Sequence, residues 1–107
     1  IGNKVLIIGG DMRKPVLHKP FNLSLKKGLS SYLSNYESLD NIIFPTDFDN
    51  LFVMPSGIVP PNPSELLESH KFEELITKLK LVYTVIIIDS TPHLKPHQLL
   101  SFRLLDG

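Results

Sequence analysis

The sequence has 107 residues, of which 42% are apolar, so it fits one globular domain with a small core. Its 11 Lys or Arg and 11 Asp or Glu cancel, and this balance gives no argument for a nucleic-acid or membrane partner. The absence of cysteine excludes disulfides and thiolate metal sites, and no apolar run approaches the roughly 20 residues of a membrane-spanning helix.

The first predicted element is a buried strand at residues 4–8, an apolar run that ends at two glycines and Asp11. Arg13 and Lys14 follow, and their cationic groups are the usual donors to phosphate oxygens. The same residues also fit a solvated Asp–Arg pair in a loop. Pro15 disfavours a helix here, so we expect the chain to leave the sheet as a loop.

The middle of the chain contains a short helix and a second strand. After a loop, residues 28–33 place Leu and Tyr side chains on one helical face, and residues 51–54 form an apolar strand that Pro55 ends. Tyr32 and Tyr36 are predicted to be packing residues.

The clearest helix start lies at Asn62. This residue suits the N-cap, Pro63 suits the first helical position, and Glu65 stands three residues after the cap, as in a capping box. Ser69 is a candidate cap for a second helix that begins at His70. The spacings of three and four among the later apolar residues predict a stripe that faces the sheet. The helical pattern as a whole runs through Leu66, Leu67, Phe72, Leu75, Ile76, Leu79 and Val82.

The most strongly patterned strand is residues 84–89, in which four β-branched residues run into Asp89. Open α/β sheets bind ligands beyond the carboxyl ends of their strands, so Asp89 is a candidate metal-positioning residue. The alternative is that it caps the turn that begins at Ser90. Ser90 and Thr91 lack the glycine-flanked elbow of a nucleophile, and no histidine pair has a metal-ligand spacing. A last helix is predicted after Pro96.

The alternation of strands and helices predicts an α/β fold with parallel strand pairing. Three strands make a thin sheet, and both ends of the sequence look cut.

Five segments of the sequence, taken in order, resemble the bacterial tyrosine kinases, the P-loop kinases of capsule and exopolysaccharide export: residues 11–15, 28–33, 50–57, 60–67 and 85–92. The proline-rich helix start at 60–67 is the most specific of them. The resemblance implies a three-layer, mostly parallel P-loop NTPase domain of the SIMIBI (ParA/MinD-like) type. Residues 1–107 would be a single partial domain, incomplete at both ends.

The family resemblance also implies roles for individual residues. Asp89 would be the Walker B aspartate that positions Mg²⁺ through water. Asp11 would be the second acid of the motif special to these kinases, which helps to hold Mg²⁺ and activates the attacking tyrosine hydroxyl. Arg13 and Ser90 would contact bound ATP. A membrane adaptor that regulates polysaccharide chain length is the implied partner. The implied location is cytoplasmic, at the inner face of the plasma membrane through such a partner or a missing membrane-spanning part.

The sequence departs from the family at several positions. The phosphate-cradling loop Gly-x-x-Gly-x-Gly-Lys-Ser/Thr does not occur, nor does the tyrosine-rich tail that the kinases phosphorylate. Gly9 stands where the first acid of the family motif is expected, and Gln98 where a further aspartate is usual. Thr91 replaces a usual proline. We therefore expect little or no kinase activity from the 107-residue chain itself.

Three functions remain open at this point. The chain is part of a tyrosine kinase domain that uses ATP and Mg²⁺, an inactive regulatory or scaffold module of polysaccharide assembly, or a ParA/MinD-like positioning ATPase. Residues 60–67 argue against the last. The family fold places the strands at 51–54, 4–8 and 84–89 side by side in that order. The outer edge of the last strand would then be unpaired, so we also expect self-association.

Overall fold

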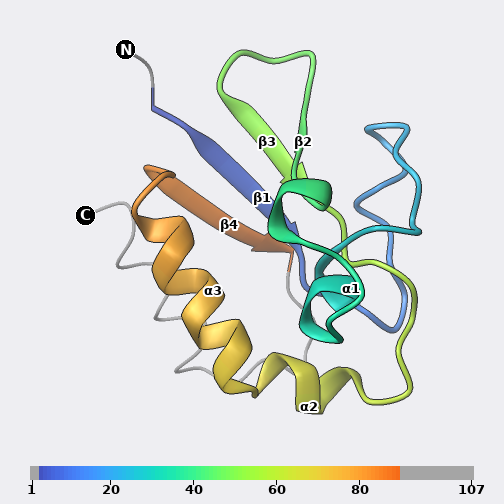
Figure 1. The fold of residues 1–107 in the computed structure, drawn as a ribbon. Coiled ribbons are helices and arrows are strands. Elements are labelled where there is room, and N and C mark those ends of the chain that lie inside the picture. The colour runs from blue at the N-terminus through green and yellow to red at the C-terminus, as the bar shows by residue number, and fades with distance from the viewer. Residues whose placement is uncertain (1–2, 90–107) are drawn as a thin grey trace.

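The computed structural model describes residues 3–89, which form one sheet with helices packed against it (Figure 1). The elements in chain order are β1 (Val5–Gly9), α1 (Leu29–Leu33), the 3-10 helix η1 (Leu39–Asn41), β2 (Phe44–Pro45), β3 (Leu51–Met54), α2 (Pro63–Leu67), α3 (His70–Lys80) and β4 (Val85–Asp89). The predicted helix after Pro96 and the candidate residues Ser90, Thr91 and Gln98 lie outside the described residues. No helix among residues 3–89 is long and apolar enough to cross a membrane.

The sheet has the strand order β2-β3-β1-β4. Strand β1 runs parallel to both β3 and β4, with Val5 opposite Leu51 on one side and Val85 on the other. This confirms the predicted α/β class and the predicted order of the three main strands. Strand β2 was not predicted, because it is only two residues long and pairs antiparallel with β3. Its proline is tolerated because β2 is an edge strand.

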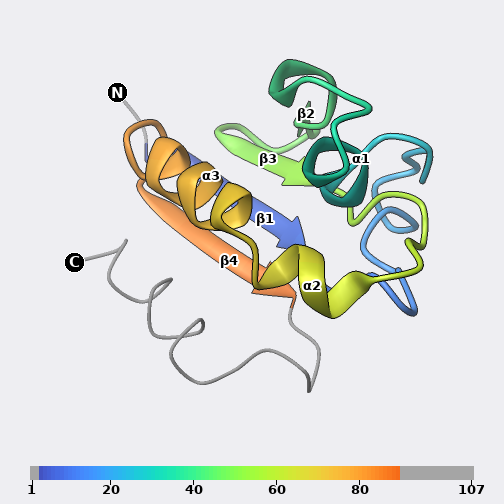
Figure 2. The same ribbon diagram turned by 60° about the horizontal axis from the view of Figure 1, so that its bottom comes forward.

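The hydrophobic core lies on one face of this sheet. Leu6 and Ile8 of β1 are fully buried there, together with apolar side chains from all three α-helices. Figure 2 shows α3 lying over β1 and β4 on that face. On the opposite face of β4, Ile87 is 48% exposed. Each fully buried Leu, Ile or Phe contributes about 1.5–3 kcal/mol, so this single face supplies most of the driving force for folding of the described residues.

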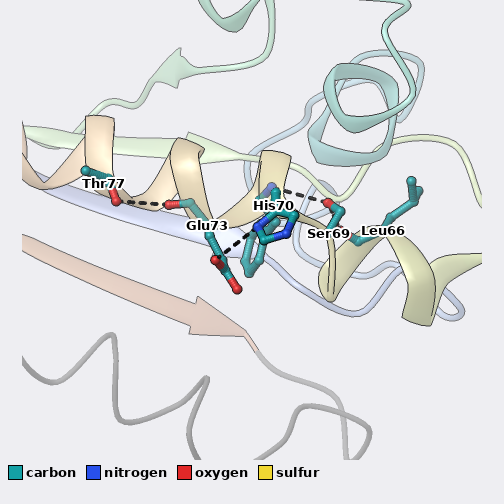
Figure 3. A network of polar contacts seen from close by, with 6 residues as sticks. Leu66, Ser69, His70, Glu73 and Thr77 are labelled. Atoms are coloured by element: carbon teal, nitrogen blue, oxygen red, sulfur yellow. Dashed lines mark hydrogen bonds and ion pairs between the residues drawn. The ribbon is translucent and has the colours of Figure 1, made fainter.

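The break between α2 and α3 is built by Ser69, as predicted. Its hydroxyl accepts a hydrogen bond from the backbone N–H of Phe72 (3.3 Å) and donates one to the carbonyl of Leu66 (2.7 Å), so it closes both helix ends (Figure 3). An N-cap of this kind contributes about 1 kcal/mol. The neighbouring His70–Glu73 contact (3.7 Å) is exposed and contributes little.

Three side-chain predictions are wrong. Asn62 is the N-cap of α2, but its amide contacts the Glu65 carboxylate (3.4 Å) instead of the backbone, so no full capping box forms. Val82 is 54% exposed, because α3 ends at Lys80 and the chain then leaves the helical repeat. Tyr36 is 83% exposed, because the turn that ends α1 directs it outward.

Tyr83 gives the fold a dependence on alkaline pH. Its ring is 9% exposed and meets the Phe52 ring edge-on at 5.7 Å, and burial raises the pKa of its hydroxyl. Below about pH 8 the hydroxyl is protonated in both the folded and the unfolded chain. At higher pH the unfolded chain loses the proton first, so the free energy of unfolding falls as pH rises through the folded-state pKa. Urea unfolding at a series of pH values above about 8 should show this fall. Tyr83→Phe should reduce it and Tyr36→Phe should not; equal curves for all three proteins would contradict the expectation.

Candidate active site

The carboxyl ends of the three parallel strands meet at one edge of the sheet. Gly9 at the end of β1 is paired with Asp89 at the end of β4, and the N–H of Gly10 donates to the carbonyl of Asp89 (3.0 Å). Asp11 follows two residues after the end of β1. The structure therefore places both predicted carboxylates at the edge where open α/β sheets bind ligands.

The Asp11 side chain shapes the loop that leaves β1. Its Oδ1 accepts hydrogen bonds from the backbone N–H groups of Arg13 (3.2 Å) and Lys14 (3.0 Å), which is an Asx-type turn. Its Oδ2 accepts no hydrogen bond from a described residue. Arg13 itself is exposed and makes no ion pair with a carboxylate of residues 3–89. The predicted Asp–Arg side-chain pair is thus replaced by contacts to the backbone.

The carboxylates of Asp11 and Asp89 are suitable ligands for an Mg²⁺ ion that is also bound by a phosphate group. Asp11 keeps one open carboxylate oxygen, and no described residue donates a hydrogen bond to the Asp89 carboxylate. Mg²⁺ in phosphoryl-transfer sites is held by one or two carboxylates together with water and phosphate oxygens. Residues 3–89 contain no group of three His, Cys, Asp or Glu residues that could form an all-protein metal cage.

The space around Gly9 is closed by the chain that follows β3. A Cβ atom added to Gly9 would lie 2.8 Å from the backbone nitrogen of Ser56 and 3.4 Å from the carbonyl carbon of Pro55. Backbone atoms cannot rotate away as a side chain can. A side chain at Gly9, the position where the family resemblance predicts a first acid, would therefore require the backbone at Ser56 to shift.

A second close contact fixes the start of α1 at the same edge. The N–H groups of Leu29 and Ser30 donate to the carbonyls of Pro55 and Ser56, both at 2.8 Å. A Cβ on Gly28 would lie 2.4 Å from the Pro55 oxygen. The first N–H groups of α1 are thus hydrogen-bonded to backbone carbonyls of the protein. Sequence reasoning missed this junction, although the glycines at 28 and 57 were the available signal.

An open α/β sheet with two acidic residues at its carboxyl edge is a ligand-binding arrangement of α/β proteins, and it agrees with the predicted P-loop NTPase type of sheet. No protein-family model matches the sequence. The tyrosine-protein kinase CpsD of Streptococcus agalactiae is 41% identical over 92 residues, which cover 85% of this chain and 40% of CpsD. Among solved structures, the chimerical protein CapA2B2 matches with a TM-score of 0.84 and 42% identity over 99% of this chain and 47% of its own. The kinase domain of the Escherichia coli tyrosine kinase ETK matches with a TM-score of 0.80 and 33% identity over 92% of this chain and 39% of its own.

The chain is therefore similar to bacterial tyrosine kinases over most of its own length, and it spans about 40% of the length of the curated relative CpsD. The cell-division ATPase MinD of Pyrococcus furiosus shares the fold less closely, with a TM-score of 0.69 and 26% identity over 97% of this chain and 44% of MinD. The structural matches to CapA2B2 and to MinD both agree with the predicted P-loop NTPase type of sheet.

Proposed function

We propose that this chain is the part of a bacterial protein-tyrosine kinase domain that carries its two acidic strand ends. In the whole protein, that domain would transfer phosphate from ATP to tyrosine and so regulate capsular or exopolysaccharide synthesis and export. The main support for this proposal is the register of β1 and β4, which pairs Gly9 with Asp89 and brings Asp11 to the same edge of the sheet. The kinase names of the relatives support the proposal.

The proposed mechanism uses few side chains. Asp89 and Asp11 would hold Mg²⁺, which offsets the negative charge of the ATP phosphates. The open oxygen of Asp11 would accept the proton of the tyrosine hydroxyl while its other oxygen keeps the loop in place. Arg13 and Ser90 would donate to the nucleotide. Positioning and charge compensation supply most of the protein's contribution to phosphoryl transfer.

The location and partner are part of the same proposal. We place the protein in the cytoplasm, at the inner face of the membrane through an adaptor of polysaccharide export that regulates chain length. Self-association stays a prediction. Within residues 3–89, the outer edge of β4 pairs with no strand, which supports it.

The second candidate is an inactive regulatory or scaffold module of the same system. The blocked space at Gly9 favours it, because an acid at this position would require the backbone at Ser56 to move. A ParA/MinD-like positioning ATPase is the weakest alternative, since MinD is 26% identical and CpsD is 41% identical.

The experiment that separates these functions grafts residues 3–89 onto CpsD in place of the segment that aligns with them. The chain alone should show no Mg²⁺-dependent ATP turnover. The graft, which keeps Gly9, should form phosphotyrosine more slowly than CpsD, and Gly9→Asp should not restore the rate because its Cβ would lie 2.8 Å from the backbone nitrogen of Ser56. A graft that binds Mg²⁺ and ATP yet forms no phosphotyrosine would favour the scaffold. ATP turnover by the chain alone would contradict the expected inactivity.

A further inference from the structure

The zero net charge of the chain hides a strong segregation of charge along the sequence. Residues 12–36 contain five Lys or Arg and no Asp or Glu, whereas residues 37–70 contain six Asp or Glu and no Lys or Arg. We call residues 13–27 the basic segment, because they hold all five cations of the first group: Arg13, Lys14, Lys19, Lys26 and Lys27. All five side chains are exposed, and none forms an ion pair with a carboxylate of the described part of the chain.

The basic segment is an ordered loop at the carboxyl edge of the sheet. It begins directly after the Asp11 turn. Backbone hydrogen bonds from Lys19 to Val16 (3.2 Å), from Asn22 to Lys19 (3.1 Å) and from Leu23 to His18 (3.0 Å) hold its bends. Figures 1 and 2 both show this loop, drawn in blue to cyan, beyond the arrowheads of β1 and β3 and beside α1. The basic segment therefore lies at the same edge of the sheet as the Asp11 turn from which it continues.

A hollow of about 270 Å³ adjoins the end of the basic segment. It lies between the α1 region and the chain that follows β3. Its apolar surface comes from Tyr36, Ile58, Val59, Pro60 and Pro61, and its polar lining consists of Lys26, three serines of the α1 region and Glu37, which is the one acid among the lining residues. Ile58 and Val59 are 59% and 50% exposed. The Ser30 hydroxyl donates to the Ile58 carbonyl (2.6 Å) and so fixes one wall against α1. Lys26 belongs to both the hollow and the basic segment, which makes the two features one continuous surface.

We propose that this surface docks the substrate peptide, and that the peptide carries acidic residues beside its tyrosine and an apolar side chain that enters the hollow. The cations would attract the acidic residues of the peptide, and the hollow would fix the position of the peptide along the surface. In peptide recognition, charged contacts commonly speed association and apolar pockets give specificity. A membrane is a poorer match, because the apolar part is concave and walled by two protein segments. That the peptide contains a tyrosine rests on the proposed function; its charge and its apolar anchor rest on the surface alone.

The first test measures binding of labelled synthetic peptides to the 107-residue chain by fluorescence anisotropy. One peptide has Glu on both sides of a Tyr and a Leu near one end. Two matched peptides replace the Glu residues by Lys or the Leu by Ser. The chain should bind the first peptide about tenfold or more tightly than either of the others. Raising the ionic strength from about 0.1 M to about 1 M should weaken that binding, because screening shortens the reach of exposed charges.

The second test reverses charges on the protein. The pair Lys14→Glu and Lys26→Glu should weaken binding of the acidic peptide by about tenfold. The matched control pair, Lys78→Glu and Lys80→Glu in the exposed last turn of α3, makes the same change in net charge and should leave binding unaltered. Val59→Ser, which changes no charge, should weaken binding of the Leu peptide and have little effect on the Ser peptide. Circular dichroism of each variant checks that it is folded.

Three results would overturn the proposal. The first is equal binding of the acidic and basic peptides. The second is an equal loss of binding in both pairs of charge reversals. The third is binding to phosphatidylserine vesicles, lost in the Lys14 and Lys26 variant, with no peptide binding, since this would assign the surface to a membrane. Absence of phosphotyrosine in the CpsD graft, with the peptide preference intact, would contradict the proposed function and leave the docking surface standing.

Discussion

Gly28→Ala is expected to lower the free energy of unfolding by about 3 kcal/mol or more, the upper range for forcing an extra methyl group into a packed site. The backbone conformation of Gly28 is not the cause, because it is extended and any residue adopts it. The cause is space. A Cβ would lie 2.4 Å from both the Pro55 oxygen and the Gly57 nitrogen, and 2.7 Å from the Gly57 Cα. All three are backbone atoms, so the start of α1 and the chain after β3 must separate.

Urea unfolding of three variants measures this effect. Lys27→Ala, an exposed neighbour, should lie within about 0.5 kcal/mol of the parent protein. Gly57→Ala should also destabilise, because its φ of +88° is unfavourable for alanine and its Cβ would meet the Ser30 hydroxyl. Ser30→Ala should relieve part of the Gly57→Ala loss and none of the Gly28→Ala loss. A Gly28→Ala protein as stable as Lys27→Ala would show that the two segments do not pack as described.

Local sequence patterns predicted the parts of the fold that depend on local causes. The apolar runs predicted β1, β3 and β4, because a strand buried within a parallel sheet needs consecutive apolar residues. Ser69 predicted the boundary between α2 and α3, because its hydroxyl accepts a hydrogen bond from an N–H group in the first turn of α3. The order of the three strands came from the family resemblance, and the structure confirms it.

The remaining features depend on residues far apart in the sequence. Nothing in the sequence near Gly9 indicates that Ser56 lies against it, so the departure from the family pattern at Gly9 could be noticed but its close contact with Ser56 could not be predicted. The same is true of the hollow, because Tyr36 and Ile58 meet only through the junction of α1 with the chain after β3. The outward direction of Tyr36 follows from the end of α1, which periodicity locates only to within a residue or two.

Asp89→Asn is the substitution expected to affect activity most. In the graft onto CpsD, it should slow phosphotyrosine formation on the order of 100-fold to 1,000-fold, the size seen when one preorganised electrostatic group is removed from an active site. The amide keeps the shape of the side chain and removes its charge, so stability should change little. Rates at saturating ATP and peptide, measured over a range of Mg²⁺ concentrations, test this. Asp47→Asn, an exposed acid before β3, is the matched control and should leave the rate unchanged.

Asp11→Asn separates the two roles assigned to that carboxylate. The asparagine oxygen can still accept hydrogen bonds from the N–H groups of Arg13 and Lys14, so the turn should survive and unfolding should be unaltered. The open oxygen would lose its charge and its capacity to take a proton, so the rate should fall as it does for Asp89→Asn. If the two carboxylates act on one Mg²⁺, the double variant should be little slower than either single one, because residues that work as a unit are not additive. Fully multiplicative losses would instead mean that the two acids act independently, and an unchanged rate for Asp11→Asn would leave it with the turn as its only role.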